Sequence, residues 1–194
     1  MSIFYAENMG TIGDNLKELS PTVFVAVPRV IEKTFDKIIA KGKDLTGIKK
    51  QLFFWAVNLG DRFKIEGNGL FYNLQLKIAR KLIFSKWKAA LGGKVKFIIS
   101  GGAALQPRLA RIFFAAGIPI FEGYGLTETS PVISANQELE PNCVMFGSVG
   151  KVIKNIEVKI AEDGEILMRG PSQMLGYYKA PEATAEAIDS EGWF

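Results

Sequence analysis

The sequence predicts an α/β fold in which a partial parallel sheet, flanked by helices, is followed by a small β-rich segment. The first observation is the continuous apolar run TVFVAV at Thr22–Val27, typical of a strand buried on both faces of a parallel sheet. The second is a strand-loop-helix-strand-loop pattern over residues 94–130. The third is the change after Pro131 to short strands separated by turns. We therefore expect an α/β subdomain over residues 1–130 and a β-rich subdomain over residues 131–194.

Helical spacing characterises the residues after the first predicted strand. Pro28 occupies the first position of a predicted helix, whose apolar residues fall on one side: Val30, Ile31, Phe35, Ile38 and Ile39. Thr46 can cap a second helix that ends near Leu59, and Asn68 can cap a third that ends near Leu91.

These last two helices form a predicted helical insertion at about 40–92, which the pair Gly92-Gly93 brings to an end. The insertion is rich in aromatic residues. We expect them to pack in a core rather than to line a cofactor site. They are Phe53, Phe54, Trp55, Phe71, Tyr72, Phe84 and Trp87.

The centre of the chain alternates strands and loops around one helix. Lys94–Ile99 is a predicted strand, Ser100–Ala104 a glycine-rich loop and Pro107–Ala116 a helix. Ile118–Phe121 is a second predicted strand, and Glu122–Ser130 a second loop. Strands joined through one helix should be parallel, so both loops should leave the carboxyl edge of the sheet. We therefore expect the two loops to line one crevice.

The predicted β-rich segment contains a hairpin and a last helix. Asn155–Ile160 alternates in polarity, Glu162–Gly164 has the composition of a tight turn, and Glu165–Met168 completes the hairpin. The last helix is expected to begin at Pro181 and to end before Asp189.

The composition excludes several kinds of chemistry. None of the 194 residues is histidine, which rules out Ser-His-Asp and Cys-His mechanisms within them. The single cysteine, Cys143, cannot form an internal disulfide, and we interpret it as a core thiol of a cytoplasmic protein. Any chemistry must therefore use carboxylates, hydroxyls, lysines, backbone amides and a hard metal such as Mg²⁺.

The charge is unevenly distributed along the chain. Residues 29–96 hold 16 of the 24 basic and 5 of the 20 acidic residues, a net charge of +11, which leaves −7 elsewhere. A solvated helical face is the simpler interpretation. The alternative is a face that meets anionic lipid, in peripheral membrane contact, or a polyphosphate such as that of CoA. No nucleic-acid recognition motif accompanies the charge, so nucleic acid is not an expected partner.

The two glycine-rich loops differ in how much chemistry they carry. SGGAA alone is better explained by a tight turn than by a binding site, because loops of small residues are common. EGYGLTETS adds an aromatic ring at Tyr124, hydroxyls at Thr127 and Thr129, and at Glu128 a carboxylate of the kind that Mg²⁺ prefers. Small residues also let backbone amides approach an anionic ligand. This loop therefore has the composition of a nucleoside triphosphate site.

The motif FEGYGLTETSP resembles the nucleotide-binding motif of the adenylate-forming superfamily, which includes acyl-CoA synthetases, peptide adenylation domains and firefly luciferase. Upstream ISGGAAL and downstream GSVGKVIKNIEVKI and GEILMRGPSQMLGYYKAPEATAEAIDSEGWF are similar in order and spacing. PTVFVAVPRVIEKTFDKI further resembles the long-chain fatty acid branch. The resemblance spans nearly the whole chain and implies part of the large N-terminal domain of such an enzyme.

The resemblance also implies roles for individual residues. In the first loop, Gly101, Gly102 and Ala103 would line the adenine and acyl pocket. In the second, Glu122 and Gly123 would contact the adenine edge, mainly through backbone, and Tyr124 would stack on adenine. Gly125 and Leu126 would shape the turn, while Gly147 to Gly150 would border the acyl side. The expected catalytic residues are Thr127, which would bind an α-phosphate oxygen, and Glu128, which would hold Mg²⁺.

The implied activity is that of an ATP-dependent long-chain fatty acid–CoA ligase. A fatty acid attacks the α-phosphate of ATP to give acyl-AMP and pyrophosphate, and the thiol of CoA then displaces AMP. The family's phosphate loop, its ribose-binding aspartate and its lysine-bearing carboxy-terminal domain have no counterpart in these 194 residues. We therefore expect the isolated chain to be inactive.

Two alternatives stay open. One is another adenylate-forming enzyme, a short-chain synthetase or an amino-acid adenylation domain. The other is a non-catalytic module that binds nucleotide or a membrane. Because Thr127 and Glu128 are both present, the catalytic interpretation is favoured.

Overall fold

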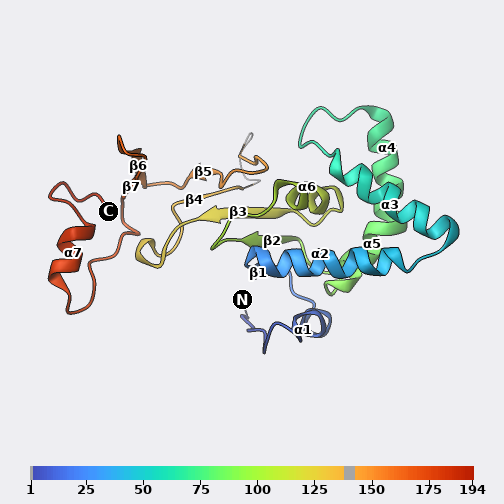
Figure 1. The fold of residues 1–194 in the computed structure, drawn as a ribbon, viewed down its shortest axis with the longest axis horizontal. Coiled ribbons are helices and arrows are strands. Elements are labelled where there is room, and N and C mark those ends of the chain that lie inside the picture. Colours follow the sequence, from blue (N-terminus) through green and yellow to red (C-terminus); the bar gives the residue numbers. More distant parts are fainter. Residues whose placement is uncertain (1, 138–142) are drawn as a thin grey trace. The chain divides into compact units, whose positions relative to one another are not determined.

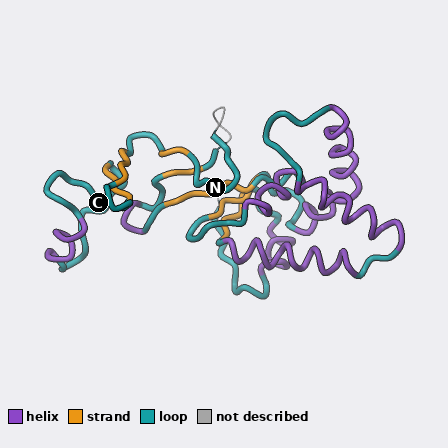
Figure 2. The backbone as a smooth tube through the Cα atoms, turned by 45° about the horizontal axis from the view of Figure 1, so that its top comes forward, coloured by secondary structure: helices purple, strands orange, loops and turns teal. Residues whose placement is uncertain are grey.

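The computed structural model describes residues 2–137 and 143–194, which form two compact units, Met1–Phe121 and Glu122–Phe194 (Figure 1). Helices make up most of the first unit, whereas strands and loops make up most of the second (Figure 2). Compact units need not coincide with domains, so the expected domain boundary after residue 130 stays a prediction. No helix in the described ranges is long and apolar enough to span a membrane.

The sheet of the first unit begins with a parallel pair. Strand β1 (Val23–Ala26) pairs with β2 (Phe97–Ser100) in the register Val23↔Phe97 to Ala26↔Ser100. The hydrogen-bonded order of strands is β1-β2-β3-β4-β5, and the Ile98 amide donates to the carbonyl of Pro119 at the start of β3 (Ile120–Tyr124). The expectation that residues 22–27 contribute a strand to a parallel sheet is therefore confirmed by its pairing with β2. The parallel direction expected for β2 and β3 stays a prediction.

The expectation that the first strand is buried on both faces is wrong. Val25 in β1 is 70% exposed and Ile99 in β2 is 39% exposed. Both side chains belong to the same register pair. This face of the pair is therefore the more exposed one, whereas the opposite face is buried, with Ile98 2% exposed.

The core of the first unit surrounds Trp87. Its ring centroid lies 5.0 Å from that of Phe84, 6.1 Å from Phe113, and 6.2 Å from both Phe35 and Phe53. These rings come from helices α2 (Pro28–Lys43), α3 (Gly47–Asp61), α5 (Ser85–Ala90) and α6 (Pro107–Ala115) and from the π-helical turn η1 (Arg80–Phe84). The expected core role of the aromatic residues is confirmed for Phe53, Phe84 and Trp87. It is wrong for Phe71, which lies on the outer side of α4 and is 74% exposed.

The third predicted helix is divided into α4 (Leu70–Ala79), η1 and α5. Its N-cap is Gly69, and the predicted cap at Asn68 is wrong because that side chain accepts a hydrogen bond from the Lys64 amide at 3.3 Å. The expected stop is confirmed. Gly92 and Gly93 adopt positive φ, and a Cβ on Gly92 would lie 2.3 Å from the Leu16 carbonyl oxygen.

Two further features of the first unit were not predicted. Helix α1 (Ile12–Leu19) buries Leu16 and contacts α5. At the π-helical turn, the Arg80 guanidinium donates to the carbonyls of Ala115 (2.8 Å) and Phe114 (3.3 Å) at the end of α6. Burial lowers the pKa of Arg80 from its ordinary value, but its charge remains well placed to complement the helix C-terminus.

The second unit contains the rest of the strands. β3 pairs antiparallel with β4 (Ser134–Ala135), and β4 pairs antiparallel with β5 (Lys151–Val152). The predicted hairpin is confirmed as β6 (Glu157–Ile160) and β7 (Ile166–Arg169), with Glu157 opposite Arg169. Helix α7 (Pro181–Ala187) begins at the expected proline.

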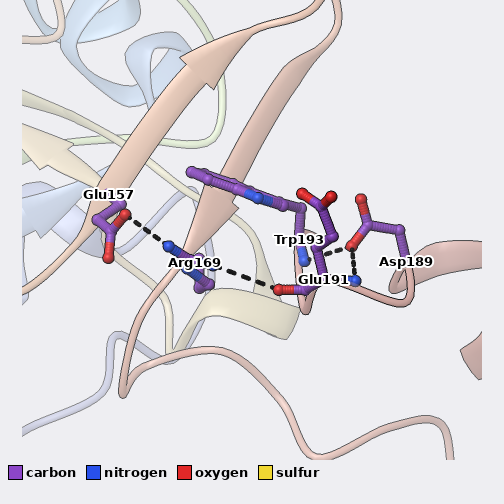
Figure 3. A network of polar contacts seen from close by, with 5 residues as sticks. All are labelled: Glu157, Arg169, Asp189, Glu191 and Trp193. Carbon is purple, nitrogen blue, oxygen red and sulfur yellow. Dashed lines mark hydrogen bonds and ion pairs between the residues drawn. The ribbon is translucent and has the colours of Figure 1, made fainter.

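A small polar network attaches the last residues to this hairpin (Figure 3). Asp189 accepts hydrogen bonds from the amides of Glu191 (2.9 Å) and Trp193 (2.8 Å), which forms a tight turn. Cations of Lys159 and Arg169 lie 4.1 and 4.6 Å from the Trp193 ring centroid. Phe194 and Met168 exchange two backbone hydrogen bonds of 3.0 and 2.8 Å, so this segment pairs with β7.

Candidate functional site

The second glycine-rich loop begins later than the sequence predicted. Glu122, Gly123 and Tyr124 belong to strand β3 rather than to a loop. The reason is their backbone pairing, because the Glu122 carbonyl accepts from the Asn136 amide (2.8 Å) and the Tyr124 carbonyl from the Ile133 amide (2.8 Å). The strand thus carries the expected adenine-contacting residues directly into the turn that follows.

Gly125 makes the turn possible. A Cβ at this position would lie 1.6 Å from the carbonyl oxygen of Pro131 and 3.0 Å from Cα of Val132. A Cβ on Gly123, in contrast, would come no closer than 3.5 Å to another heavy atom. The chain therefore requires glycine at residue 125, where two backbone segments touch, and has room for a side chain at residue 123.

The buried side chain of Thr129 stabilises the turn through hydrogen bonds to its backbone. Its side chain is fully buried, and Oγ1 accepts a hydrogen bond from the Leu126 amide at 2.9 Å. The same hydroxyl lies 3.0 Å from the Leu126 carbonyl and 2.8 Å from the Pro131 carbonyl, either of which can accept its proton. This internal bonding occupies the hydroxyl, so the suggestion that Thr129 offers it to a ligand is wrong.

The remaining side chains of the turn reach the surface. Residues Thr127–Thr129 form one turn of 3₁₀-helix, η2, in which Thr127 is exposed and Glu128 is half-buried. Leu126 is exposed, Tyr124 is half-buried, and Glu122 is buried. Thr127 and Glu128 thus present a hydroxyl and a carboxylate side by side at the surface of the second unit.

Glu128 is held at two points by the segment around residue 175. Its side-chain Oε1 accepts a hydrogen bond from the Tyr177 hydroxyl at 3.1 Å, and its backbone carbonyl accepts from the Met174 amide at 2.7 Å. The hydrogen bond to Glu128 raises the pKa of Tyr177, and desolvation and the charge of Glu128 add to the effect. No lysine or arginine in the described parts of the chain forms an ion pair with Glu128.

The surroundings of Glu128 suit a Mg²⁺ ion that is bound by one protein carboxylate and otherwise by substrate phosphates and water. No group of three or more acidic, cysteine or histidine side chains gathers anywhere in residues 2–137 and 143–194. Mg²⁺ is often bound by one or two protein carboxylates together with substrate phosphates and water. A half-exposed carboxylate with one oxygen engaged by a neutral hydroxyl and no cation beside it suits that arrangement.

The first glycine-rich loop lies in the first unit. Gly102 has φ of +82°, a conformation that favours glycine, and Gly102 and Ala103 are exposed while Gly101 is half-buried. Ser100, predicted as the first residue of this loop, instead ends strand β2. Its Oγ is buried and has no hydrogen-bond partner among the described residues. The predicted convergence of this loop with the second one stays a prediction.

Sequence reasoning missed two residues that organise the second unit. In the Asn136 side chain, Nδ2 donates to the Ser148 carbonyl and Oδ1 accepts from the backbone amide of Met145 (2.9 Å), which ties the segment before Gly150 to the end of strand β4. The second is Tyr177, in the sequence MLGYYKAPE, for which the resemblance implied no role. A polar side chain 49 positions from its partner in the chain leaves no periodic signal that could have revealed the contact.

Comparisons with known proteins agree on one family. The model of the AMP-binding enzyme family matches residues 3–178. The chain is 37% identical over 183 residues to the long-chain fatty acid–CoA ligase FadD15 of Mycobacterium bovis, covering 92% of this chain and 30% of that protein. It is also 37% identical over 195 residues to the human long-chain fatty acid–CoA ligase ACSBG2, covering 95% of this chain and 28% of that one.

Solved structures show the same fold. The o-succinylbenzoate-CoA synthetase of Bacillus subtilis, in complex with its acyl-adenylate intermediate, superposes with a TM-score of 0.57 at 20% identity, over 96% of this chain and 30% of that chain. A fatty acyl-CoA synthetase of Mycobacterium tuberculosis superposes with a TM-score of 0.56 at 18% identity, over 96% and 29%. The chain thus spans about 30% of the length of the proteins that it matches. Because the family model covers most of its residues, the chain belongs to the AMP-binding enzyme family.

Proposed function

We propose that this chain is part of an ATP-dependent long-chain fatty acid–CoA ligase, which activates a fatty acid as acyl-AMP and transfers the acyl group to CoA. The names of its curated relatives support the substrate class. The observation that carries the proposal is the surface turn of the second unit, in which Gly125 and Leu126 connect strand β3 to Thr127 and Glu128. This turn offers the hydroxyl and carboxylate that binding of a metal-bound triphosphate requires.

In the proposed site, each residue has a task in positioning or in charge neutralisation. The ring of Tyr124 stacks on adenine, the Thr127 hydroxyl donates to an α-phosphate oxygen, and the Glu128 carboxylate holds Mg²⁺. When bound, Mg²⁺ supplies the positive charge that offsets the charge developing on the phosphates. The fatty carboxylate is already a nucleophile, so its attack on the α-phosphate needs no histidine base. Accurate placement of the reactants accounts for most of the acceleration.

The proposal also includes the first glycine-rich loop. Gly102 and Ala103 lack bulky side chains and are exposed, so a flat ligand can approach their backbone closely. We place the adenine and the start of the acyl chain against this loop, with Gly101 beside them. The buried, unpartnered hydroxyl of Ser100 next to it supports a polar ligand or water at this end of β2.

The test is a substitution of Glu128 by glutamine in the full-length protein. The change removes the charge and keeps the shape, so the rate of fatty-acid-dependent pyrophosphate release should fall roughly 100-fold or more, as for the loss of a group that stabilises transition-state charge. Glu162→Gln, which removes one exposed carboxylate from the predicted hairpin turn, is the matched control and should leave the rate unchanged. A Glu128→Gln enzyme as fast as this control would refute the metal-binding role.

A specific observation favours a second, compatible function, contact with a membrane surface. Helix α4 and the π-helical turn expose apolar side chains at helical spacing, with exposures of 91% for Leu70, 74% for Phe71, 57% for Leu74, 43% for Ile78 and 46% for Leu82. Exposed Lys77 and Lys81 lie on the same helical segment. We propose that this face, called the α4 face below, touches an anionic lipid surface from the cytoplasmic side, with the apolar residues inserted and the lysines at the headgroups.

A further inference from the structure

We infer that Tyr177 is a positioning residue that holds the Glu128 carboxylate ready for its metal ion. The inference rests on the proposed function of Glu128 and extends it to a residue to which no role has been given. It stands on the hydrogen bond of 3.1 Å from the Tyr177 hydroxyl to Oε1 of Glu128, which joins residues 49 positions apart.

The backbone of Tyr177 is held in place by helix α7. Its amide donates to Oγ1 of Thr184 at 2.9 Å, and that hydroxyl lies 2.9 Å from the carbonyl of Ala180 at the start of helix α7. Gly176 has φ of +147°, and a Cβ there would come within 2.8 Å of the Thr184 side chain. Glycine therefore lets the chain pass close to α7 and directs the next residue, Tyr177, towards Glu128.

The backbone of Glu128 is held by the same segment. The Met174 amide donates to the Glu128 carbonyl at 2.7 Å, only three residues before Tyr177. Main chain and side chain of Glu128 are thus both tied to residues 174–177. A glutamate side chain that is tied in this way has fewer rotamers to lose when it binds a metal ion.

The donor is suited to leave the carboxylate available. A tyrosine hydroxyl is neutral, so it orients one oxygen without neutralising the negative charge, as a lysine or arginine would. The hydrogen bond engages Oε1, and Oε2 has no hydrogen bond or ion pair to any described residue. Oε2 can therefore coordinate a hard cation while Oε1 remains oriented by Tyr177.

The experiment compares Tyr177→Phe with Tyr178→Phe in the full-length protein. Tyr178 is 88% exposed, and its hydroxyl makes no hydrogen bond to any described residue, so it is the matched control. For Tyr177→Phe, the Mg²⁺ concentration for half-maximal pyrophosphate release should rise roughly 5-fold, the effect of losing one exposed hydrogen bond. The rate at saturating Mg²⁺ should return to that of the unchanged protein, because Tyr177 does not touch the reacting atoms.

A second measurement needs neither metal nor activity. In protein labelled at the tyrosine Cζ with ¹³C, the Tyr177 resonance, assigned as the one lost in Tyr177→Phe, should shift when Glu128 is replaced by glutamine. The Tyr178 resonance should stay in place. An unshifted Tyr177 signal, or a half-saturating Mg²⁺ concentration in Tyr177→Phe that is equal to or below that of the unchanged protein, would overturn the inference.

If Tyr177→Phe behaves normally while Glu128→Gln is inactive, only the positioning role fails. If Glu128→Gln is itself fully active, the proposed function fails.

Discussion

At the scale of single residues, the second glycine-rich loop divides its work between structure and chemistry. Gly125 and Thr129 build the turn. Gly125 leaves room for Pro131, and the Thr129 hydroxyl accepts from the Leu126 amide and can donate to the carbonyl of Leu126 or of Pro131. Thr127 and Glu128 are then free to face outwards. A motif of the form GLTET therefore contains two kinds of residue that look alike in sequence, and burial is the property that separates Thr129 from Thr127.

Because Gly125 builds the turn and Gly123 does not, substitution by alanine should destabilise the fold far more at Gly125 than at Gly123. Gly125→Ala should destabilise the folded protein by about 2–4 kcal/mol, because the new Cβ overlaps the Pro131 backbone, which cannot move aside as a flexible side chain could. Gly123→Ala places its Cβ in ordinary contact and should change the free energy of unfolding by less than about 1 kcal/mol. Urea denaturation of both variants measures the difference, and equal effects would show that the close approach at Gly125 is relieved by backbone movement.

Sequence reasoning at the residue scale worked where a side chain acts on its own neighbours and failed where the partner is distant. The positive φ of Gly92 and Gly93 and the prolines at the starts of α2, α6 and α7 follow from local backbone chemistry. The bond between Tyr177 and Glu128 does not, because only the folded chain brings them together. One local assignment also failed: Asn68 is not the cap of α4, because the backbone amide of Lys64, four residues earlier, donates to its side chain.

At the scale of elements, the hydrophobic pattern predicted helices well and glycine-containing strands poorly. Helices α2 and α6 show clear apolar spacing, and their starts agree with the predicted ones. Residues 122–124 were predicted as the start of the second glycine-rich loop, yet they continue β3 through hydrogen bonds to residues 133 and 136. Pairing with β4 overrides local preference there.

The same patterning shows what the α4 face should do. With Phe71→Ser and Leu74→Ser combined, full-length protein should bind vesicles of phosphatidylcholine with phosphatidylserine at least ~10-fold more weakly, because two apolar side chains no longer enter the lipid. Binding of the unchanged protein should also fall at high salt and be weak on phosphatidylcholine alone, since the lysines are screened or lack anionic partners. Co-sedimentation of protein with vesicles measures both effects.

The control for the α4 face is Ile160→Ser, which removes an apolar side chain that is 64% exposed on β6. It should leave vesicle binding unchanged. If the α4 double variant binds as tightly as this control, the face does not contact lipid, and another part of the longer protein is then the better candidate to cover it.

At the scale of the whole molecule, the chain combines a candidate ligand-binding turn in its second unit with a helical first unit that is rich in basic residues. The stretch 29–96 carries a net charge of +11 and the rest −7, so the proposed metal-binding carboxylate lies in the acidic part of the sequence and the proposed lipid contact in the basic part. Function in a protein of this composition depends on where each charge lies rather than on the modest total of +4.

The final prediction concerns the 194-residue chain by itself. Its turn at Thr127 and Glu128 supplies ligands for phosphate and metal, but adenylation also requires groups that hold the β- and γ-phosphates and the ribose, and the motifs that provide them in the resembling family are missing from these residues. Incubated with ATP, Mg²⁺, a long-chain fatty acid and CoA, the purified chain should therefore form no more acyl-CoA than its own Glu128→Gln variant, as measured by chromatography. The reason is that an incomplete site cannot place the fatty carboxylate and the α-phosphate in line for attack. Acyl-CoA formation above the level of that variant would contradict the prediction and would mean that Glu128 and its neighbours suffice for both half-reactions.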